Sequence, residues 1–177
     1  MKKKILVYGI NYFPEKVGIG KYNFEMSNWL VENNFEVKVI TANKYFPEWR
    51  VYNNNYSREY IKGVEVIRCP IWVPKKPSGF TRIIHFLSFA ITSFLPLARN
   101  IFLQPNLIIL VSPSILFAPS LLFLKLLLGK KIKTWIHVQD FEVDAAFKLK
   151  ILKGNLLKNF ILLIEKKILC QFDILST

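Results

Sequence analysis

The fold of this chain is decided by residues 5–25, ILVYGINYFPEKVGIGKYNFE. The stretch begins with an apolar, β-branched run typical of a buried strand and continues through a loop that contains Gly18 and Gly20. Apolar side chains then recur at the spacing of one helix face, at Tyr22, Met26, Trp29 and Leu30. A helix N-terminus that follows glycines presents unpaired N–H groups and a partial positive charge. The stretch therefore predicts an α/β protein that binds an anionic or sugar ligand at the carboxyl end of its first strand.

The same glycines also raise the question of a dinucleotide site. The Rossmann fingerprint needs G-x-G-x-x-G/A directly after the strand and an acidic residue about 20 residues further on. Here Asn23 stands where the third small residue belongs, and the second expected strand ends in TAN at residues 41–43, without an acid. The pattern argues against NAD binding. Another alternative stays open, in which Gly18 and Gly20 only shape a turn.

Composition limits the classes of protein to consider. The chain has 177 residues, enough for one well-packed domain, with a net charge of +13 and 52% hydrophobic residues. Basic and apolar character together favour an anionic membrane surface as a partner, and no nucleic-acid-binding module is recognisable. Cys69 and Cys170 lie outside any CxxC or Cys/His cluster, so we expect reduced thiols and no metal site. Residues 1–4 run straight into a strand pattern without the apolar segment of a signal peptide, which predicts a cytoplasmic location.

Strand and helix patterns alternate along the rest of the chain. Strands are expected at Lys4–Gly9, Glu36–Thr41, Val64–Cys69, Leu107–Val111, Lys133–Val138 and Asp173–Ser176. Helices are expected at 20–33, 81–103, 114–128 and 155–171. Near-continuous apolar strands that alternate with helices form parallel sheets covered on both faces. The predicted fold is a Rossmann-like open α/β sheet that forms one domain over residues 1–177.

Two apolar stretches resemble membrane spans. Residues 107–129 have about the length of a span, but serines and prolines divide them into a strand and a helix. Residues 86–98 are shorter, and polar side chains fall in and around them at helical spacing, at His85, Ser88, Thr92 and Arg99. This pattern predicts an amphipathic helix whose wide apolar face rests on lipid or on a partner. A transmembrane helix remains the alternative.

Aromatic residues are dense in residues 43–62, and the next loop carries Trp72. Aromatic rings on a polar loop can stack on sugars or lie at a membrane interface. Tyr45, Phe46, Trp49 and Trp72 are therefore candidates for contact with an acceptor or with a membrane. The open alternative is a loop that its own aromatic side chains hold against the sheet.

Polar side chains gather where the strand at Lys133–Val138 ends. Strand alternation places His137 and Gln139 on one face, and Asp140 follows directly. Open α/β sheets bind ligands at this end of their strands, and carboxylate and amide groups hydrogen-bond sugar hydroxyls. Asp140, Gln139 and His137 are the candidate catalytic residues. The alternative for His137 is a hydrogen-bonded core histidine.

Four motifs carry a resemblance to a known family: KILVYGINYFPEKVGIGKY, ITANKYFPEW, RCPIWVPKKPSG and IHVQDFEVDA. In this order they resemble the N-terminal half of bacterial GT-B glycosyltransferases of family four, and in particular the fucosyltransferase-like colanic-acid biosynthesis group. The similarity covers essentially the whole chain. It implies a retaining enzyme that needs no metal or other cofactor and transfers a sugar from a nucleotide-sugar donor. It also implies a lipid-linked glycan acceptor at the cytoplasmic face of the membrane, in the synthesis of exopolysaccharide or O-antigen.

The resemblance implies roles for two groups of residues. Gly18-Ile19-Gly20 matches the family's glycine-rich loop beside the donor phosphates, and Lys21 lies where it adds a positive charge. Gln139-Asp140 matches a position where many members carry a His-Asp pair. This chain has glutamine in the histidine place, and His137 lies two residues earlier.

The family also has a C-terminal domain that binds the donor nucleotide, and chemistry occurs between the two domains. This chain ends at Thr177, in the last strand expected of the N-terminal domain. We therefore expect a fragment, a truncated product or one subunit of a split enzyme, with little activity alone. Two alternatives stay open: a non-catalytic subunit that recruits a separate catalytic subunit to the membrane, and a nucleotide-binding regulatory domain.

Overall fold

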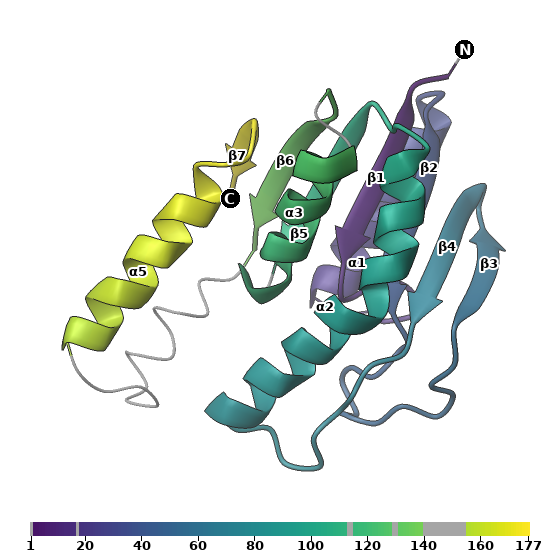
Figure 1. Ribbon diagram of the computed structural model, residues 1–177. Coiled ribbons are helices and arrows are strands. Elements are labelled where there is room, and N and C mark those ends of the chain that lie inside the picture. The colour runs from purple at the N-terminus through teal and green to yellow at the C-terminus, as the bar shows by residue number, and fades with distance from the viewer. Residues whose placement is uncertain (1, 17, 113–114, 129–130, 140–154) are drawn as a thin grey trace.

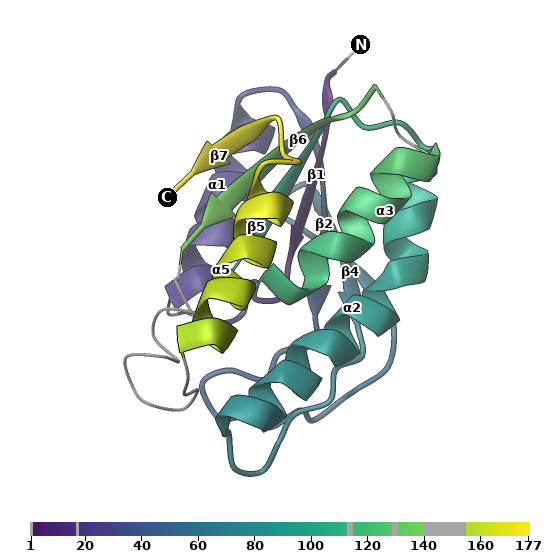
Figure 2. The same cartoon turned by 60° about the vertical axis from the view of Figure 1, so that its left-hand side comes forward.

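The protein is described by a computed structural model that covers all residues except 1, 17, 113–114, 129–130 and 140–154. The described residues form a seven-stranded sheet in the order β3-β4-β2-β1-β5-β6-β7. Neighbouring strands are parallel except for the pair β3 and β4. Helix α1 lies on one face of the sheet, and α2, α3 and α5 lie on the other (Figures 1 and 2). The predicted Rossmann-like α/β fold is confirmed.

Most of the predicted elements are present with closely similar bounds. The strands are β1 Lys4–Gly9, β2 Glu36–Ala42, β3 Ser57–Ile61, β4 Val64–Cys69, β5 Leu107–Ser112, β6 Lys133–Val138 and β7 Ile174–Ser176. The helices are α1 Gly18–Glu32, α2 Gly79–Phe102, α3 Ala118–Leu128 and α5 Asn155–Leu169, and a short 3₁₀ helix, Ile115–Phe117, precedes α3.

Strand β3 was missed, because residues 43–62 were predicted to be irregular throughout. It pairs with β4 in an antiparallel hairpin whose turn consists of Lys62 and Gly63. Their φ angles are +47° and +81°, which is the left-handed conformation of a two-residue hairpin turn. The hairpin makes β3 an edge strand, and β3 is itself the carboxyl-terminal part of the aromatic segment 43–62.

The alternation of side chains along β1 builds two cores. Leu6 and Tyr8 point into the larger core, beneath α2 and α3, whereas Ile5 and Val7 point toward α1. The Tyr8 hydroxyl lies 2.7 Å from Ser93 Oγ, so the sheet is tied directly to the middle of α2. These contacts fix which side of α2 faces the protein.

The polar stripe predicted on α2 faces the loop after β4. His85 Nδ1 donates to the Trp72 carbonyl at 2.7 Å, and Ser88 Oγ accepts from Trp72 N–H at 3.0 Å. One turn further on, the Thr92 hydroxyl donates to the Pro70 carbonyl at 2.6 Å. The opposite, apolar side of the helix is consequently left toward solvent. Within the described residues α2 is the one helix with the length and composition to cross a membrane, and a third of its most apolar window is buried in the protein.

Candidate functional site

The two predicted halves of the site lie at the same edge of the sheet. In the strand register Gly9 is level with Val111, and Val111 is level with His137. Since adjacent strands are about 4.8 Å apart, Gly9 and His137 are separated by about 10 Å across the carboxyl edge. Gln139 is half-buried just beyond β6, while Asp140 lies outside the described residues. The glycine loop after β1 and the polar end of β6 thus lie where parallel α/β sheets bind ligands.

The two glycines of this loop have different surroundings. Gly18 begins α1 with a φ of +58°, it is exposed, and no heavy atom lies within 4 Å of a Cβ added there. Gly20 is buried, and an added Cβ would lie 2.8 Å from the Glu15 Cβ. Ile19 packs partly against the core beneath α1, and the exposed Lys21 lies 3.8 Å from Glu25. The absence of a side chain at Gly20 therefore has a structural explanation. Contact of this loop with a phosphate stays a prediction. Of the two glycines, only Gly18 lies on the open side of the loop, where a phosphate could approach.

Glu15 is the residue of this edge that the sequence interpretation missed. Its side chain is buried, and Oε1 accepts from Phe46 N–H at 3.1 Å and from Tyr45 N–H at 3.3 Å. Oε2 accepts from Asn11 Nδ2 at 2.8 Å. Burial raises the pKa of this carboxyl, although the three hydrogen bonds oppose the shift. Glu15 therefore clamps the glycine loop to the aromatic segment. The sequence signal that could have identified Glu15 was its position just before the two glycines and the start of the expected helix.

The aromatic residues predicted to face an acceptor or a membrane divide into two groups. Tyr45 is only 4% exposed, and its hydroxyl accepts from Asn11 Nδ2 at 3.1 Å, so it cannot present its ring outward. This corrects the prediction for Tyr45. Phe46 and Trp49 pack against the larger core and are partly buried, as in the alternative of a loop held by its own aromatics. Trp72 is 45% exposed and remains a candidate for contact with an acceptor or membrane.

A buried arginine ties the same loop to the hairpin. The Arg68 guanidinium donates to the Phe13 carbonyl and forms an ion pair with Glu59 of β3. An open hollow lies beside this pair, and it is lined by Pro14, Asn43, Lys44, Tyr52, Asn53, Ser57, Glu59 and Arg68. The hollow adjoins the glycine loop through Pro14, so it belongs to the candidate site.

Asn23 has a clear structural role. Its Nδ2 donates to the Asn11 carbonyl at 2.9 Å and lies 3.3 Å from a Cβ added at Gly9. The residue that argued against a dinucleotide fingerprint thus binds the first turns of α1 to the loop after β1.

His137 is fixed by its neighbours on β6 and β7. Ser176 Oγ accepts from Trp135 Nε1 at 2.8 Å and lies 2.9 Å from His137 Nδ1. The ring is half-buried. Because Nδ1 is hydrogen-bonded to Ser176, Nε2 is the ring nitrogen that could bind a ligand. No group of three or more His, Cys, Asp or Glu side chains that could hold a metal occurs among the described residues, so metal-free chemistry remains a prediction.

The other histidine predicts a pH dependence of stability. His85 is fully buried, and because the Trp72 carbonyl only accepts, the ring proton lies on Nδ1. Burial lowers the pKa of His85 below its ordinary value of 6.5, so the unfolded chain takes up the proton first as the pH falls. The free energy of unfolding should therefore decrease as the pH drops below about 6.5.

The measurement is denaturant unfolding between about pH 8 and 5, compared with a His85→Asn variant. Asparagine keeps an N–H donor near the Trp72 carbonyl but does not titrate, so its unfolding free energy should depend less on pH. Parallel curves for the two proteins would show that His85 does not carry the effect.

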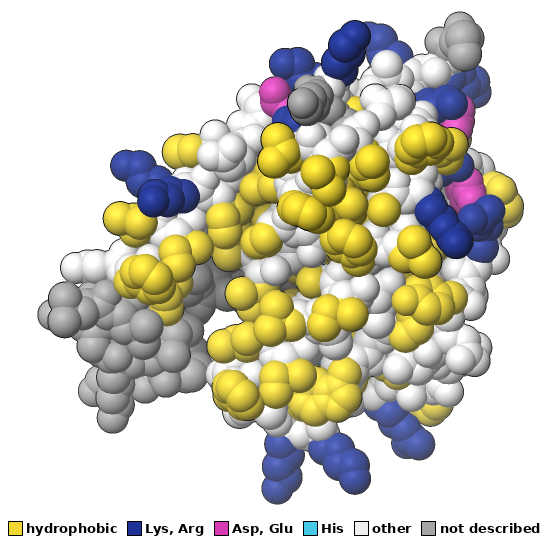
Figure 3. Space-filling model, in the orientation of Figure 1, with side chains coloured by type: hydrophobic (Ala, Val, Ile, Leu, Met, Phe, Trp, Pro, Cys, Tyr) yellow, Lys and Arg dark blue, Asp and Glu magenta, His cyan; other side chains and the backbone are white. Residues whose placement is uncertain are grey.

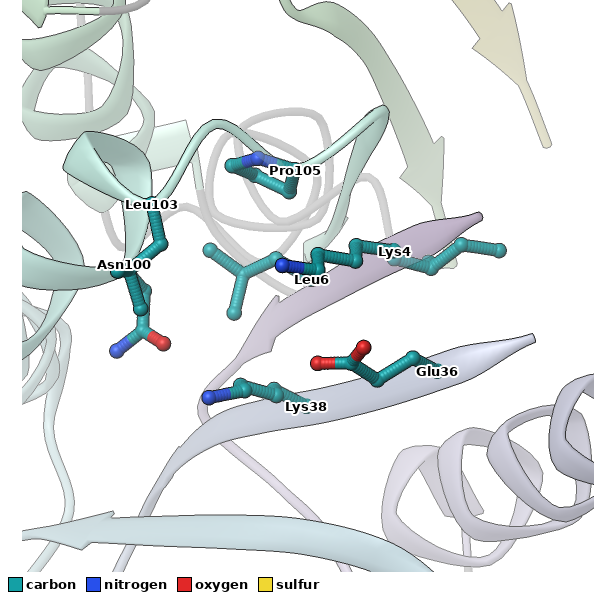
Figure 4. Close-up of a pocket in the computed structure, with 8 residues that line it drawn as sticks. Lys4, Leu6, Glu36, Lys38, Asn100, Leu103 and Pro105 are labelled. Carbon is teal, nitrogen blue, oxygen red and sulfur yellow. The ribbon is translucent and has the colours of Figure 1, made fainter. Parts of the chain in front are cut away.

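A second hollow lies at the opposite edge of the sheet. Figure 4 shows its lining, which comes from the amino-terminal ends of β1 and β2 and from the end of α2. The lining residues are Lys4, Ile5, Leu6, Glu36, Lys38, Asn100, Leu103 and Pro105. Because it opens at the amino end of the strands, this hollow is separate from the candidate site.

Comparison with known proteins gives two similarities. The chain is 44% identical over 181 aligned positions to a protein of Escherichia coli (strain K12) whose name is "Putative colanic acid biosynthesis glycosyl transferase WcaI". The match covers 98% of this chain and 44% of that protein, so the chain spans less than half of its relative's length. A solved structure of the catalytic domain of Starch Synthase IV from Arabidopsis thaliana, bound to ADP and acarbose, aligns with a TM-score of 0.53. The sequence identity is 16%, and the alignment covers 80% of this chain and 35% of the starch synthase chain, so this similarity shows the fold alone. No protein-family model matches.

The sheet order and the structural similarity together define a Rossmann-like α/β domain with the fold seen in the starch synthase catalytic domain. The similarity along almost the whole chain then confirms the expected resemblance to the glycosyltransferases of colanic acid biosynthesis.

Proposed function

We propose that this chain is the N-terminal, acceptor-side half of a glycosyltransferase that moves a sugar from a nucleotide-sugar donor to a glycan acceptor. The observation that carries the proposal is the 44% identity along 98% of the chain to a colanic acid biosynthesis glycosyl transferase. Because that relative is covered over only 44% of its length, the proposal includes a donor-binding half, in the same polypeptide or in a second subunit. The chain alone is then expected to have little or no activity.

The donor diphosphate would lie against the start of α1. Gly18 is exposed there, and no heavy atom lies within 4 Å of a Cβ added to it, so phosphate oxygens can approach the backbone N–H groups of the first turn. These dipoles, together with the ammonium group of Lys21, would stabilise the negative charge that develops on the leaving nucleoside diphosphate. Glu15 would keep the loop in place from its buried side, away from the ligand. No metal is required for this role.

The end of β6 would position the reacting sugar. His137 has Nδ1 engaged by Ser176, so Nε2 is available to a sugar hydroxyl or a phosphate oxygen. Gln139 and Asp140 would hold further hydroxyls of the donor sugar or acceptor. Transfer with retention at the anomeric carbon is part of the proposal.

The acceptor would enter on the other side of the glycine loop. The hollow beside Pro14 offers Asn53 and Ser57 as hydrogen-bonding groups and the exposed ring of Tyr52 as a surface on which a sugar can stack. We propose a lipid-linked glycan as the acceptor, which places the protein on the cytoplasmic face of the membrane as a peripheral protein. The exposed Trp72 would contact the acceptor or the lipid.

Sugar transfer tests this function. The chain is assayed alone and with the donor-binding half supplied, against a panel of nucleotide sugars and a lipid-linked acceptor. Transfer is expected only in the combined assay, and the product should keep the anomeric configuration of the donor when its proton NMR spectrum is recorded. Absence of transfer with every donor, or an inverted product, would contradict the proposal.

A further inference from the structure

Three hydrogen-bonding side chains meet where β6 and β7 lie side by side (Figure 1). The two strands are parallel, and Ser176 is level with His137. Trp135 lies two residues before His137, so strand alternation places both rings on one face of the sheet, with their centroids 6.5 Å apart. Trp135 packs partly against the core beneath α1, so this is the α1 face. Figure 3 shows the opposite face, where apolar side chains gather over α2 and α3.

The Ser176 hydroxyl is hydrogen-bonded to both rings. Trp135 Nε1 can only donate, so Ser176 Oγ accepts from it at 2.8 Å. The same oxygen lies 2.9 Å from His137 Nδ1. A hydroxyl that accepts one hydrogen bond becomes a better donor in the next, because the two bonds polarise each other. The contact with Trp135 therefore favours donation from Ser176 to His137 Nδ1.

The reverse direction of this bond would satisfy fewer groups. If His137 Nδ1 carried the ring proton, Ser176 Oγ would accept two hydrogen bonds. The hydroxyl proton would then have no acceptor among the residues that the structure describes, and it would need a water molecule. Donation by Ser176 instead uses the indole N–H, the hydroxyl proton and the Nδ1 lone pair together.

We propose that Ser176, held by Trp135, fixes the neutral ring of His137 in the tautomer that carries its proton on Nε2. His137 then presents an N–H donor at the carboxyl edge of the sheet, and its one lone pair is already used by Ser176. Ser176 and Trp135 are positioning residues, because they act through His137.

This inference rests on the proposed function for its purpose. An Nε2 donor binds an oxygen that accepts hydrogen bonds, as the phosphate oxygens of a nucleotide sugar do, and it stabilises negative charge there. The same nitrogen cannot remove a proton from an acceptor hydroxyl. His137 is consequently a hydrogen-bond donor to the ligand, and it is not the base of the transfer reaction.

The first test is nitrogen NMR of the imidazole rings in the 177-residue chain, without donor or acceptor. Spectra are recorded at about pH 8, where an ordinary imidazole is neutral. The chain has two histidines, and His85 is the internal control because its Nδ1 donates to the Trp72 carbonyl. We expect opposite tautomers, with the proton on Nε2 in His137 and on Nδ1 in His85.

A Ser176→Ala variant removes the hydroxyl from this arrangement. The Nδ1 signal of His137 should shift to that of an unbonded nitrogen, and a share of the Nδ1–H tautomer should appear, while the His85 signals stay unchanged. Ser176→Thr keeps a hydroxyl and suits a strand, so it should restore the original His137 signals. Circular dichroism and thermal unfolding check that both variants are folded.

The second test measures sugar transfer by the chain with the donor-binding half supplied. His137→Leu removes the N–H donor and should lower kcat by about 100-fold or more, as loss of one donor to a developing charge does. His137→Gln keeps an N–H donor but cannot act as a base, so its kcat should fall by only about tenfold.

Three results would overturn the inference: a proton on Nδ1 of His137 in the unaltered chain, His137 signals that Ser176→Ala leaves unchanged, or equal losses of kcat in the two His137 variants. The NMR measurement contains no substrate. Absence of transfer with every donor would therefore contradict the proposed function and leave the tautomer result standing. Transfer by a chain with Nδ1 protonated would contradict this inference alone.

Discussion

A Gly20→Val variant is expected to lose about 1–3 kcal/mol of unfolding free energy, because even its Cβ would lie 2.8 Å from the Glu15 Cβ. The Glu15 backbone carbonyl oxygen lies 3.1 Å from the same position, so the strain cannot be relieved by a side-chain rotation alone. Moving Glu15 would also weaken its bonds to Tyr45 and Phe46. Denaturant unfolding of the chain measures the loss.

Gly18→Asn is the matched control in the same loop. Nothing lies within 4 Å of the added Cβ, and asparagine tolerates the φ of +58° better than other residues with a side chain. Its stability should change by less than about 1 kcal/mol. Equal losses at the two glycines would show that Glu15 is not packed against Gly20.

A Phe89→Ala variant is expected to lose about 3–5 kcal/mol. Phe89 is fully buried, and its ring lies 5.5 Å from that of Tyr8 and 5.4 Å from that of Phe117, measured between centroids. Alanine would leave a cavity between α2 and the sheet. Denaturant unfolding again gives the magnitude.

Phe94→Ala on the same helix is its control. Phe94 is 38% exposed on the outward side of α2, so the chain in solution should lose much less, about 1 kcal/mol. A loss at Phe94 as large as that at Phe89 would mean that the outward side of α2 is packed against protein, which would contradict the exposure of Phe94.

The sequence predicted the sheet well because its strands are apolar over most of their length. β1, β4 and β6 begin and end at the predicted residues. β1 and β4 are almost wholly buried, and buried strands of this kind read as short apolar runs in the sequence. β3 escaped prediction because it is an edge strand with mostly exposed side chains, so it lacks an apolar run. Its real signal was the Lys62-Gly63 turn, which is visible only when both flanking segments are considered as strands.

The candidate site was less predictable, because orientation depends on tertiary contacts. Composition alone does not show that Tyr45 turns inward, since its burial depends on Asn11 and Glu15, residues distant in sequence. The sequence predicted the apolar side of α2, but it did not show why that side faces solvent. The polar side chains of the helix form hydrogen bonds with the backbone at Pro70 and Trp72, which turns the apolar side outward. It was predictable that the glycine loop and His137 lie at the same edge of the sheet, because the carboxyl ends of parallel strands all lie at one edge.

The central claim is that the open side of the glycine loop and the end of β6 hold a nucleotide sugar. The most direct measurement is amide and imidazole NMR of the labelled chain, with the donor-binding half supplied, during titration with the nucleotide sugar that supports transfer. We expect shifts of the amide signals of Gly18, Ile19 and Gly20 and of the His137 ring signals, whereas the signals of Lys4, Glu36 and Asn100 at the opposite hollow should stay unchanged. Shifts confined to that opposite hollow, or none at either edge while transfer proceeds, would contradict it.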